Sequence, residues 1–213
     1  ILIGREYQQG IRNIVFTPHY RRGMFEIESK ERLEVYKRTV SDLLVTYPKM
    51  SFYYGCELHI NESSMSGLGD ILNFIHGKKL ILAEFDYDVS FEKMVRLIKR
   101  IESLGIKIIV AHVERYDCVK KDMDRIAKLR DMGCLIQVNA DSVIGKAGLF
   151  AKFNTHKMIK NNLVDFIASD AHDVDHRDVR MKKAMDYVSK KYGAEVVELL
   201  FRKNAEALFG IGG

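Results

Sequence analysis

The feature that most constrains the fold of this 213-residue chain is the regular alternation of two sequence patterns. Short runs rich in β-branched and other apolar residues alternate with longer amphipathic segments. Near-continuous apolar runs of this length are typical of parallel strands that are covered on both faces. The pattern predicts strands at residues 12–18, 51–58, 79–85, 107–113, 134–140 and 164–169.

The amphipathic segments between these runs predict helices, and strands that alternate with helices define an α/β domain. A nucleotide-binding fold of this class would require G-x-G-x-x-G or G-x-x-x-x-G-K-[ST] after a strand, and neither motif occurs. The glycine pair in SGLGD, residues 66–70, instead indicates a turn or a helix start. Helices are predicted at residues 29–46, 91–104, 120–132, about 149–161, 177–192 and 194–208.

Composition narrows the class of protein. The chain is 47% hydrophobic, so it can bury a core, and no apolar run approaches the ~20 residues of a membrane helix. The start, ILIGREYQQG, does not resemble a secretory signal. The formal net charge is +5, but the lysines are spread along the helices, so we do not expect nucleic-acid binding. We expect one compact domain, residues 1–213, in the cytoplasm and without membrane insertion.

Polar residues of a particular kind stand where the predicted strands end. Five of the six carboxyl ends carry Glu, Asp or His, and the remaining one carries Asn139. In a barrel of parallel strands all carboxyl ends converge on one mouth, which is where catalytic residues lie. The residues expected to meet there are His19, Glu57, Glu84, His112, Asp170 and His172.

Carboxylates and imidazoles brought together in this way need positive charge among them. Mixed nitrogen and oxygen ligands suit Zn²⁺, Mn²⁺ or Fe²⁺, and the absence of thiolates favours harder ions such as Mn²⁺. Bridging carboxylates imply more than one ion, as in two-metal hydrolases. The other histidines are weaker candidates. We expect His59 behind the ligands on the same strand face, and His76 and His156 at the surface, while His176 has no assigned role.

Arginines follow several of these candidate ligands closely. Arg115 lies three residues after His112, Arg177 lies five after His172, and Arg21 and Arg22 follow His19. The planar guanidinium group matches the oxygens of a phosphate. Metals and arginines at one mouth therefore indicate hydrolysis of a phosphate ester.

The three cysteines do not support another chemistry. Their odd number and irregular spacing argue against a disulfide framework or a zinc knuckle. Cysteine-dependent phosphatases require Cys-x₅-Arg, yet the residues six positions after Cys56, Cys118 and Cys134 are Glu62, Asp124 and Ala140. A cysteine mechanism is therefore excluded.

The segments TPHYRRGMF, GCELH, AHVERY, DMGCLIQVN and IASDAH, together with Arg177, resemble the PHP (polymerase and histidinol phosphatase) superfamily. They are most similar to its manganese-dependent bacterial protein-tyrosine phosphatases of capsular and exopolysaccharide operons. The resemblance implies a distorted TIM-like (β/α)₇ barrel with two or three divalent ions, Mn²⁺ first, with Fe, Zn or Mg possible. It places the six residues named above at metal-ligand positions and Arg115 and Arg177 at positions that hold the substrate phosphate.

One departure from the family pattern concerns the first strand. The family opens with Asp-x-His-x-His, which supplies further ligands, and this chain has no such segment. Ile1 aligns inside the first helix, so we expect a domain that is N-terminally incomplete, with its first strand absent. The alternative is a protein that has lost part of its site.

The expected function is hydrolysis of phosphotyrosine on protein, opposing a bacterial tyrosine kinase in capsular or exopolysaccharide synthesis. The loop YRRGMF, residues 20–25, suits a peptide partner, so Tyr20 and Arg22 are further candidates for substrate contact. Two alternatives remain open: a small-molecule phosphatase of the histidinol-phosphate type, and a non-catalytic interaction domain. A homo-oligomer is also compatible with the sequence.

Overall fold

The computed structural model of the protein describes residues 1–64, 68 and 74–210. The chain divides into two compact units, one made of residues 11–111 and the other of residues 1–10 together with residues 112–213. Apart from Leu68, the glycine-containing segment SGLGD lies outside the described residues.

Parallel strands form the centre of the unit of residues 11–111. Strands β2 (His19–Tyr20), β4 (Glu57–His59), β5 (Leu80–Glu84) and β6 (Lys107–Val110) lie side by side in that order. Strands β1 (Asn13–Phe16) and β3 (Ser51–Tyr54) form a separate parallel pair. The parallel arrangement agrees with the prediction from the apolar runs.

The prediction of two unbroken strands at residues 12–18 and 51–58 is wrong, because each is interrupted and divided in two. Pro18 has no backbone N–H to donate to a strand ladder. Gly55 lies so close to the other chain segments that a Cβ atom there would lie 3.4 Å from the carbonyl oxygen of Phe16 and 3.1 Å from Cγ1 of Ile75. The interruptions separate β1 from β2 and β3 from β4.

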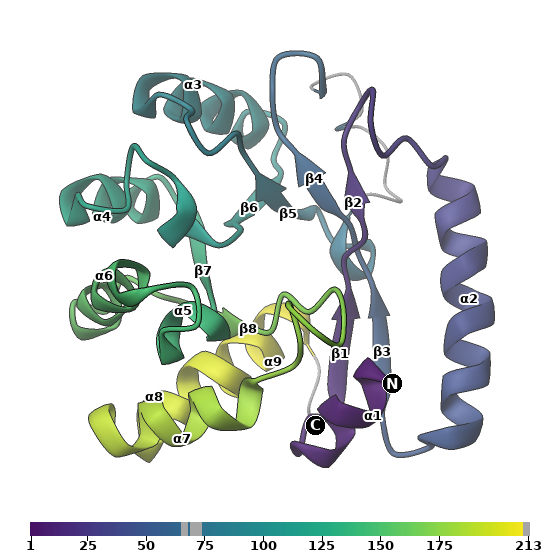
Figure 1. Ribbon diagram of the computed structural model, residues 1–213. Helices are drawn as coiled ribbons and strands as arrows, with labels where there is room; N and C mark the ends of the chain where they lie inside the picture. The colour runs from purple at the N-terminus through teal and green to yellow at the C-terminus, as the bar shows by residue number, and fades with distance from the viewer. Residues whose placement is uncertain (65–67, 69–73, 211–213) are drawn as a thin grey trace. The chain divides into compact units, whose positions relative to one another are not determined.

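The helices of this unit follow the predicted segments closely. Helix α2 (Ser29–Thr46) has the predicted bounds, and Figure 1 shows it alongside β1 and β3. Helix α3 (Phe91–Glu102) begins after Ser90, whose side chain accepts a hydrogen bond from the backbone N–H of Lys93. The apolar face of α3 is buried, as its amphipathic sequence predicts. A short 3₁₀ helix, η3 (Ile75–Gly77), precedes β5.

The second unit contains two parallel strands, β7 (Leu135–Asn139) and β8 (Phe166–Ala168), in which Val138 lies opposite Ile167. The helices of this unit are α1 (Leu2–Gln8), η4 (Val113–Arg115), α4 (Met123–Asp131), α5 (Ala140–Ile144), α6 (Leu149–Lys160), α7 (Met181–Tyr192), α8 (Ala194–Glu198), the π-helical η5 (Leu199–Lys203) and α9 (Asn204–Phe209).

Among the helices of both units, within the described residues, none has the length and hydrophobicity that a membrane-spanning helix requires.

The helices of this unit differ from the predictions in several places, and α4 begins at Met123 rather than at residue 120. The helix predicted from residue 177 begins at Met181, so the preceding residues stay in a loop that carries Arg177. The predicted helix 194–208 contains a π-helical turn between α8 and α9. Helix α5 was not predicted, since its five residues are too few to show an amphipathic period.

The prediction that His156 lies at the surface is wrong, whereas His76 is exposed as expected. His156 is 7% exposed within α6. Its Nε2 lies 3.0 Å from the carbonyl oxygen of Val143, and its Nδ1 lies 2.8 Å from the hydroxyl of Tyr192. These contacts connect α6 to α5 and to the end of α7. Burial, with the nearby charges of Lys191 and Lys152, lowers the pKa of His156 to about 4.

We expect acid to destabilise the protein partly through His156. Its folded-state pKa of about 4 lies below the ordinary value of 6.5, so as pH falls through this window the unfolded chain takes up the proton first. A His156→Gln variant should lose roughly 1–3 kcal/mol at pH 7 through its buried hydrogen bonds. The penalty should shrink at pH 5, because glutamine does not titrate. Urea unfolding of both proteins at the two pH values checks this, and an equal penalty at both would contradict it.

Candidate metal centre and phosphate site

In the unit of residues 11–111, the strand register brings the first group of candidate residues next to one another. His19 lies opposite Glu57, and His59 lies opposite Glu84. Side chains alternate along a strand, so Glu57 and His59 project from the same face of β4. Three of the six candidate ligands therefore come together, although His19 and Glu57 lie in the short strands β2 and β4, and only Glu84 ends its strand.

The side chains of this group converge closely. His19 Nδ1 lies 3.4 Å from Glu57 Oε2 and 3.8 Å from Glu84 Oε2. One potential ligand atom from each of the three residues lies within 4.8 Å of the others. We call His19, Glu57 and Glu84 the acidic cluster.

Two further residues extend the acidic cluster. His59 is 2% exposed, and its Nδ1 lies 3.5 Å from Glu84 Oε2 while its Nε2 lies 3.1 Å from Asp86 Oδ1. His59 thus lies beside the candidate ligand Glu84, and its role behind the ligands stays a prediction. Asp86 was not singled out from the sequence, because it follows the strand end by two residues inside an unremarkable turn.

The donor set of the acidic cluster fits a divalent metal ion. Glu57 is 4% exposed and its carboxylate faces that of Glu84, so the two negative charges repel each other in a partly desolvated place. A cation bound between them would relieve that repulsion. Two carboxylates and an imidazole, with no thiolate, suit an ion that accepts oxygen and nitrogen ligands.

The second unit gathers its candidate residues around Asp170. Its Oδ2 lies 2.5 Å from Arg177 Nη2 and 3.2 Å from Arg115 Nη2, and it accepts a hydrogen bond of 2.6 Å from Asn139 Nδ2. We call Arg115, Asn139, Asp170 and Arg177 the Asp170 cluster. Burial by itself raises the pKa of Asp170, but the charges of Arg115, Arg177 and His112 outweigh it, so the pKa is lowered.

Two of the candidate ligands in this unit have left-handed backbone conformations. His112, two residues after β6, has φ 33°, and Asp170, two residues after β8, has φ 49°. Such values are uncommon for residues other than glycine and cost free energy, which the surrounding structure must supply. At His112, the backbone N–H donates to Gln137 Oε1 at 2.6 Å. Gln137 Nε2 in turn donates to Asn139 Oδ1 at 2.8 Å, so one network reaches from His112 to Asp170.

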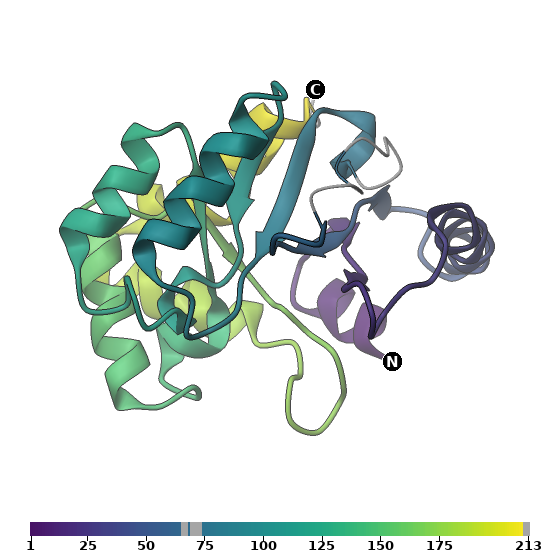
Figure 2. The same cartoon turned by 90° about the horizontal axis from the view of Figure 1, so that it is seen from above.

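The loop between β8 and α7 orients Arg177 and His172, and Figure 2 shows it as a long irregular excursion. Asp173 Oδ1 accepts from the backbone N–H groups of Asp175, His176 and Arg177, an arrangement that closes the loop. His172 Nδ1 lies 3.7 Å from Asp170 Oδ1, with a third of its side chain exposed. The second unit thus supplies the other three candidate ligands, His112, Asp170 and His172.

Glu114 is a buried acid that the sequence patterns did not single out. It is 3% exposed, and its Oε1 accepts from the backbone N–H of Asn139 at 3.0 Å and from Ser142 Oγ at 2.7 Å. Burial raises its pKa. The carboxylate fixes the junction of β7 and α5, which positions the Asn139 side chain toward Asp170.

The two predicted substrate-contact residues lie near the acidic cluster in sequence and have partners in their own unit. Arg32 lies over the ring of Tyr20, 5.0 Å from its centroid. Arg22 donates to the carbonyl oxygen of Ser63 at 3.1 Å and lies 3.8 Å from Glu26. Neither contact involves a candidate ligand.

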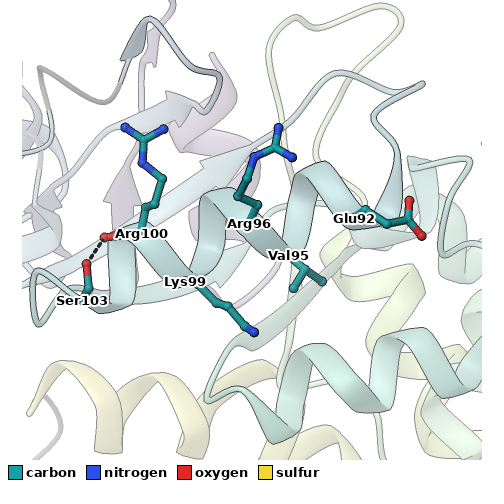
Figure 3. A pocket seen from close by; sticks show the side chains of 6 residues that line it. All are labelled: Glu92, Val95, Arg96, Lys99, Arg100 and Ser103. Carbon is teal, nitrogen blue, oxygen red and sulfur yellow. Dashed lines mark hydrogen bonds between the residues drawn. The ribbon is translucent and has the colours of Figure 1, made fainter.

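A separate open pocket lies on α3, and Figure 3 shows the side chains that line it, Glu92, Val95, Arg96, Lys99, Arg100 and Ser103. Arg96 and Arg100 extend from one side of the helix and pair with Glu62 at 3.3 Å and 2.5 Å. None of the candidate ligands lines this pocket. Its arginines have a carboxylate partner already, so we assign it no role in the chemistry.

Comparisons with known proteins show which family this chain belongs to. The family described as "Capsular polysaccharide synthesis, CpsB/CapC" matches residues 2–210. The chain is 31% identical over 216 residues to the tyrosine-protein phosphatase CpsB of Streptococcus pneumoniae, covering 95% of this chain and 86% of that protein.

Solved structures with a similar fold include one of the same kind of phosphatase. One of the crystal structures of YwqE from Bacillus subtilis and CpsB from Streptococcus pneumoniae, described as unique metal-dependent tyrosine phosphatases, matches with a TM-score of 0.86 and 25% identity. It covers 98% of this chain and 85% of that chain. A D-hydantoinase shares the fold alone, with a TM-score of 0.56 and 11% identity over 91% of this chain and 62% of that chain. The predicted α/β class is confirmed, and these likenesses agree with a distorted barrel.

Glu6 is a further buried carboxylate, and it lies next to the Asp170 cluster. It lies in α1, is 8% exposed and is hydrogen-bonded to the side chain of Ser169, the residue before Asp170. Its Oε2 has no hydrogen-bond partner among the described residues. Burial, with the charge of Asp178, raises its pKa from 4.5 to about 7 against the opposing effect of the hydrogen bond.

We expect a Glu6→Gln variant to be more stable than the wild type at alkaline pH. The folded-state pKa of about 7 exceeds the ordinary 4.5, so as pH rises through this window the unfolded chain loses its proton first and the wild type loses stability. Glutamine removes this loss, which approaches about 3 kcal/mol above pH 7. Urea unfolding at pH 5 and pH 8 measures the difference. A gain that does not grow with pH would show that Glu6 is not buried as an acid of raised pKa.

Proposed function

Because the chain belongs to the CpsB/CapC family of capsular polysaccharide synthesis, we propose that it is a metal-dependent phosphatase that hydrolyses phosphotyrosine on protein. The observation that carries this proposal is the convergence of His19, Glu57 and Glu84, in a chain whose relatives are named tyrosine-protein phosphatases. A non-catalytic interaction domain would not need two neighbouring carboxylates in a partly desolvated cluster.

Six residues would hold the metal ions. The acidic cluster supplies His19, Glu57 and Glu84, and the second unit supplies His112, Asp170 and His172. We propose that these residues bind two or three divalent ions in total. The carboxylate-rich donor set without thiolate favours Mn²⁺, with Fe, Zn or Mg as the other candidates. Bound ions of this kind would supply the positive charge and Lewis acidity that phosphate-ester hydrolysis requires.

Arg115 and Arg177 would bind the phosphoryl group. Each contacts Asp170 through Nη2. A guanidinium group carries five N–H donors in a planar fork, so one arginine can contact a carboxylate and phosphate oxygens at the same time. Asp170 and Asn139 thereby orient both arginines before substrate arrives. This preorganisation is the condition under which charged donors stabilise the developing charge of a transition state most effectively.

Departure of the leaving group requires little assistance from the protein. A tyrosine side chain has an ordinary pKa near ~10, so its phenolate departs with modest help from an acid. The site therefore needs charge stabilisation and orientation more than a strong acid. Tyr20 and Arg22, in the segment that follows His19, are proposed to contact the polypeptide around the phosphotyrosine.

The proposed partner is a phosphotyrosine protein, and we propose a bacterial tyrosine kinase of capsular or exopolysaccharide synthesis as that protein. We propose that the reaction takes place in the cytoplasm. A histidinol-phosphate phosphatase would use the same metal ions. The difference between the two enzymes would lie in the pocket that binds the substrate.

We expect Glu57→Gln to abolish activity by removing a ligand. The Mn²⁺-loaded wild type should hydrolyse a phosphotyrosine peptide with a higher kcat/KM than histidinol phosphate. The variant should lose more than about 100-fold in kcat/KM, since even residues that only support ligands are worth about 10- to 100-fold. Manganese titration should show weaker binding in the variant.

The matched control is Glu62→Gln, which removes an exposed carboxylate that pairs with Arg96 and Arg100 in the same unit. It should keep wild-type kinetics and metal binding. The metal-free Glu57→Gln protein should melt no lower than the metal-free wild type, because it loses one of two repelling charges. Full turnover in Glu57→Gln, or in the wild type after exhaustive chelation, would refute the metal-dependent mechanism.

We expect Arg115→Ala and Arg177→Ala to weaken phosphate recognition while metal binding stays intact at pH 7.5. Each loses a charge-assisted contact worth roughly 2–4 kcal/mol in the transition state, or about 30- to 1000-fold in kcat/KM. Inhibition by free phosphate should weaken in both variants. Arg202→Ala, which removes an exposed arginine paired with Glu198 and Glu206, is the control. Loss of bound metal together with activity would assign the arginines to supporting Asp170 instead.

A further inference from the structure

The segment after His19 forms a closed turn with an aromatic residue at its end. The backbone N–H of Phe25 donates to the carbonyl oxygen of Arg21 at 2.8 Å, and the N–H of Arg21 donates to the carbonyl oxygen of Phe25 at 3.2 Å. Gly23, at the tip, has φ +79°, a conformation that other residues rarely adopt. The position of Phe25 is therefore fixed by hydrogen bonds rather than by burial.

The ring of Phe25 lies against the acidic cluster. Its centroid is 5.9 Å from that of the His19 imidazole, and the two ring planes differ by 24°, which is an offset stack. Phe25 is nevertheless 50% exposed. Half of a large apolar side chain thus remains accessible next to a residue that we propose as a metal ligand.

The turn is also connected to the acidic cluster through side chains. Arg21 Nη2 lies 3.4 Å from Asp86 Oδ1, and the same oxygen lies 3.1 Å from His59 Nε2. His59 contacts Glu84 in turn. One end of the turn therefore contacts the candidate ligand His19, and the other end is linked to the candidate ligand Glu84 through Asp86 and His59.

We propose that Phe25 is an aromatic platform that binds the phenyl ring of the substrate and makes the site prefer aryl over alkyl phosphate esters. This inference rests on the proposed function and names the group that recognises the tyrosine ring. In an aryl phosphate only one oxygen separates the ring from phosphorus. A phosphate bound through a metal ion at the acidic cluster would therefore place that ring beside the exposed part of Phe25. An alkyl ester places a flexible aliphatic carbon there, which cannot stack.

The experiment measures ligand affinity, so that it does not depend on turnover. Phenylphosphonate and methylphosphonate are titrated calorimetrically into the Mn²⁺-loaded protein, the second serving as the reference without a ring. Phe25→Leu keeps apolar area but removes the ring. Because the contact between the two aromatic rings is lost, we expect the affinity for phenylphosphonate to fall by about 3- to 10-fold. Methylphosphonate affinity should not change.

Two variants serve as controls. Phe25→Tyr keeps the ring and should retain the affinity for phenylphosphonate. Met24→Ala removes the neighbouring side chain of the same turn, which is 62% exposed, and should also behave as the wild type. An unchanged phenylphosphonate affinity in Phe25→Leu, or an equal loss for both phosphonates, overturns the proposal.

The outcome is separable from that of the proposed function. A ring preference that depends on Phe25, in a protein that does not hydrolyse a phosphotyrosine peptide, would uphold the platform and reject the phosphatase activity. Hydrolysis of the peptide with no contribution from Phe25 would do the opposite. A phosphotyrosine peptide and a phosphoserine peptide of the same sequence, assayed with wild type and Phe25→Leu, complete the comparison.

Discussion

The cost of desolvating carboxylates is the constraint on which the candidate site depends. Asp170, Glu57 and Glu84 all lie at or near strand ends, where neighbouring chain segments exclude water. An ionised carboxylate in such a place is stable only beside positive charge or hydrogen-bond donors. The two units meet this requirement with different partners.

Around Asp170 the positive charge is built into the protein. Arg115 and Arg177 hold its pKa low despite its burial, and Asn139 donates a further hydrogen bond. In the acidic cluster, Glu57 and Glu84 lie beside the imidazoles of His19 and His59, whose charge depends on protonation. Imidazole is a good ligand when it is neutral, so this cluster suits a metal cation as the source of charge.

Backbone geometry supports this interpretation of the second unit. Left-handed conformations at His112 and Asp170 are costly, and two hydrogen bonds stabilise the residues that adopt them, one donated by the His112 backbone N–H to Gln137 and one donated by Asn139 to Asp170. Strain of this kind is concentrated at functional sites, because it aims side chains where regular structure would not. Glu114 and Asp173 serve the same end at a distance, since each organises backbone that carries a contact to Asp170.

The sequence by itself determined the α/β class, the parallel strands, helix α2 to the residue, and the residue types at the strand ends. These follow from local periodicity, which one chain displays directly. Only the tertiary structure decided that His156 is buried, that Pro18 and Gly55 divide two strands, and that Asn139, Glu114 and Phe25 adjoin candidate residues. Those outcomes depend on neighbours that are distant in sequence, such as Tyr192 for His156. Strand ends indicate which residues can meet, but register and packing decide which atoms come within bonding distance.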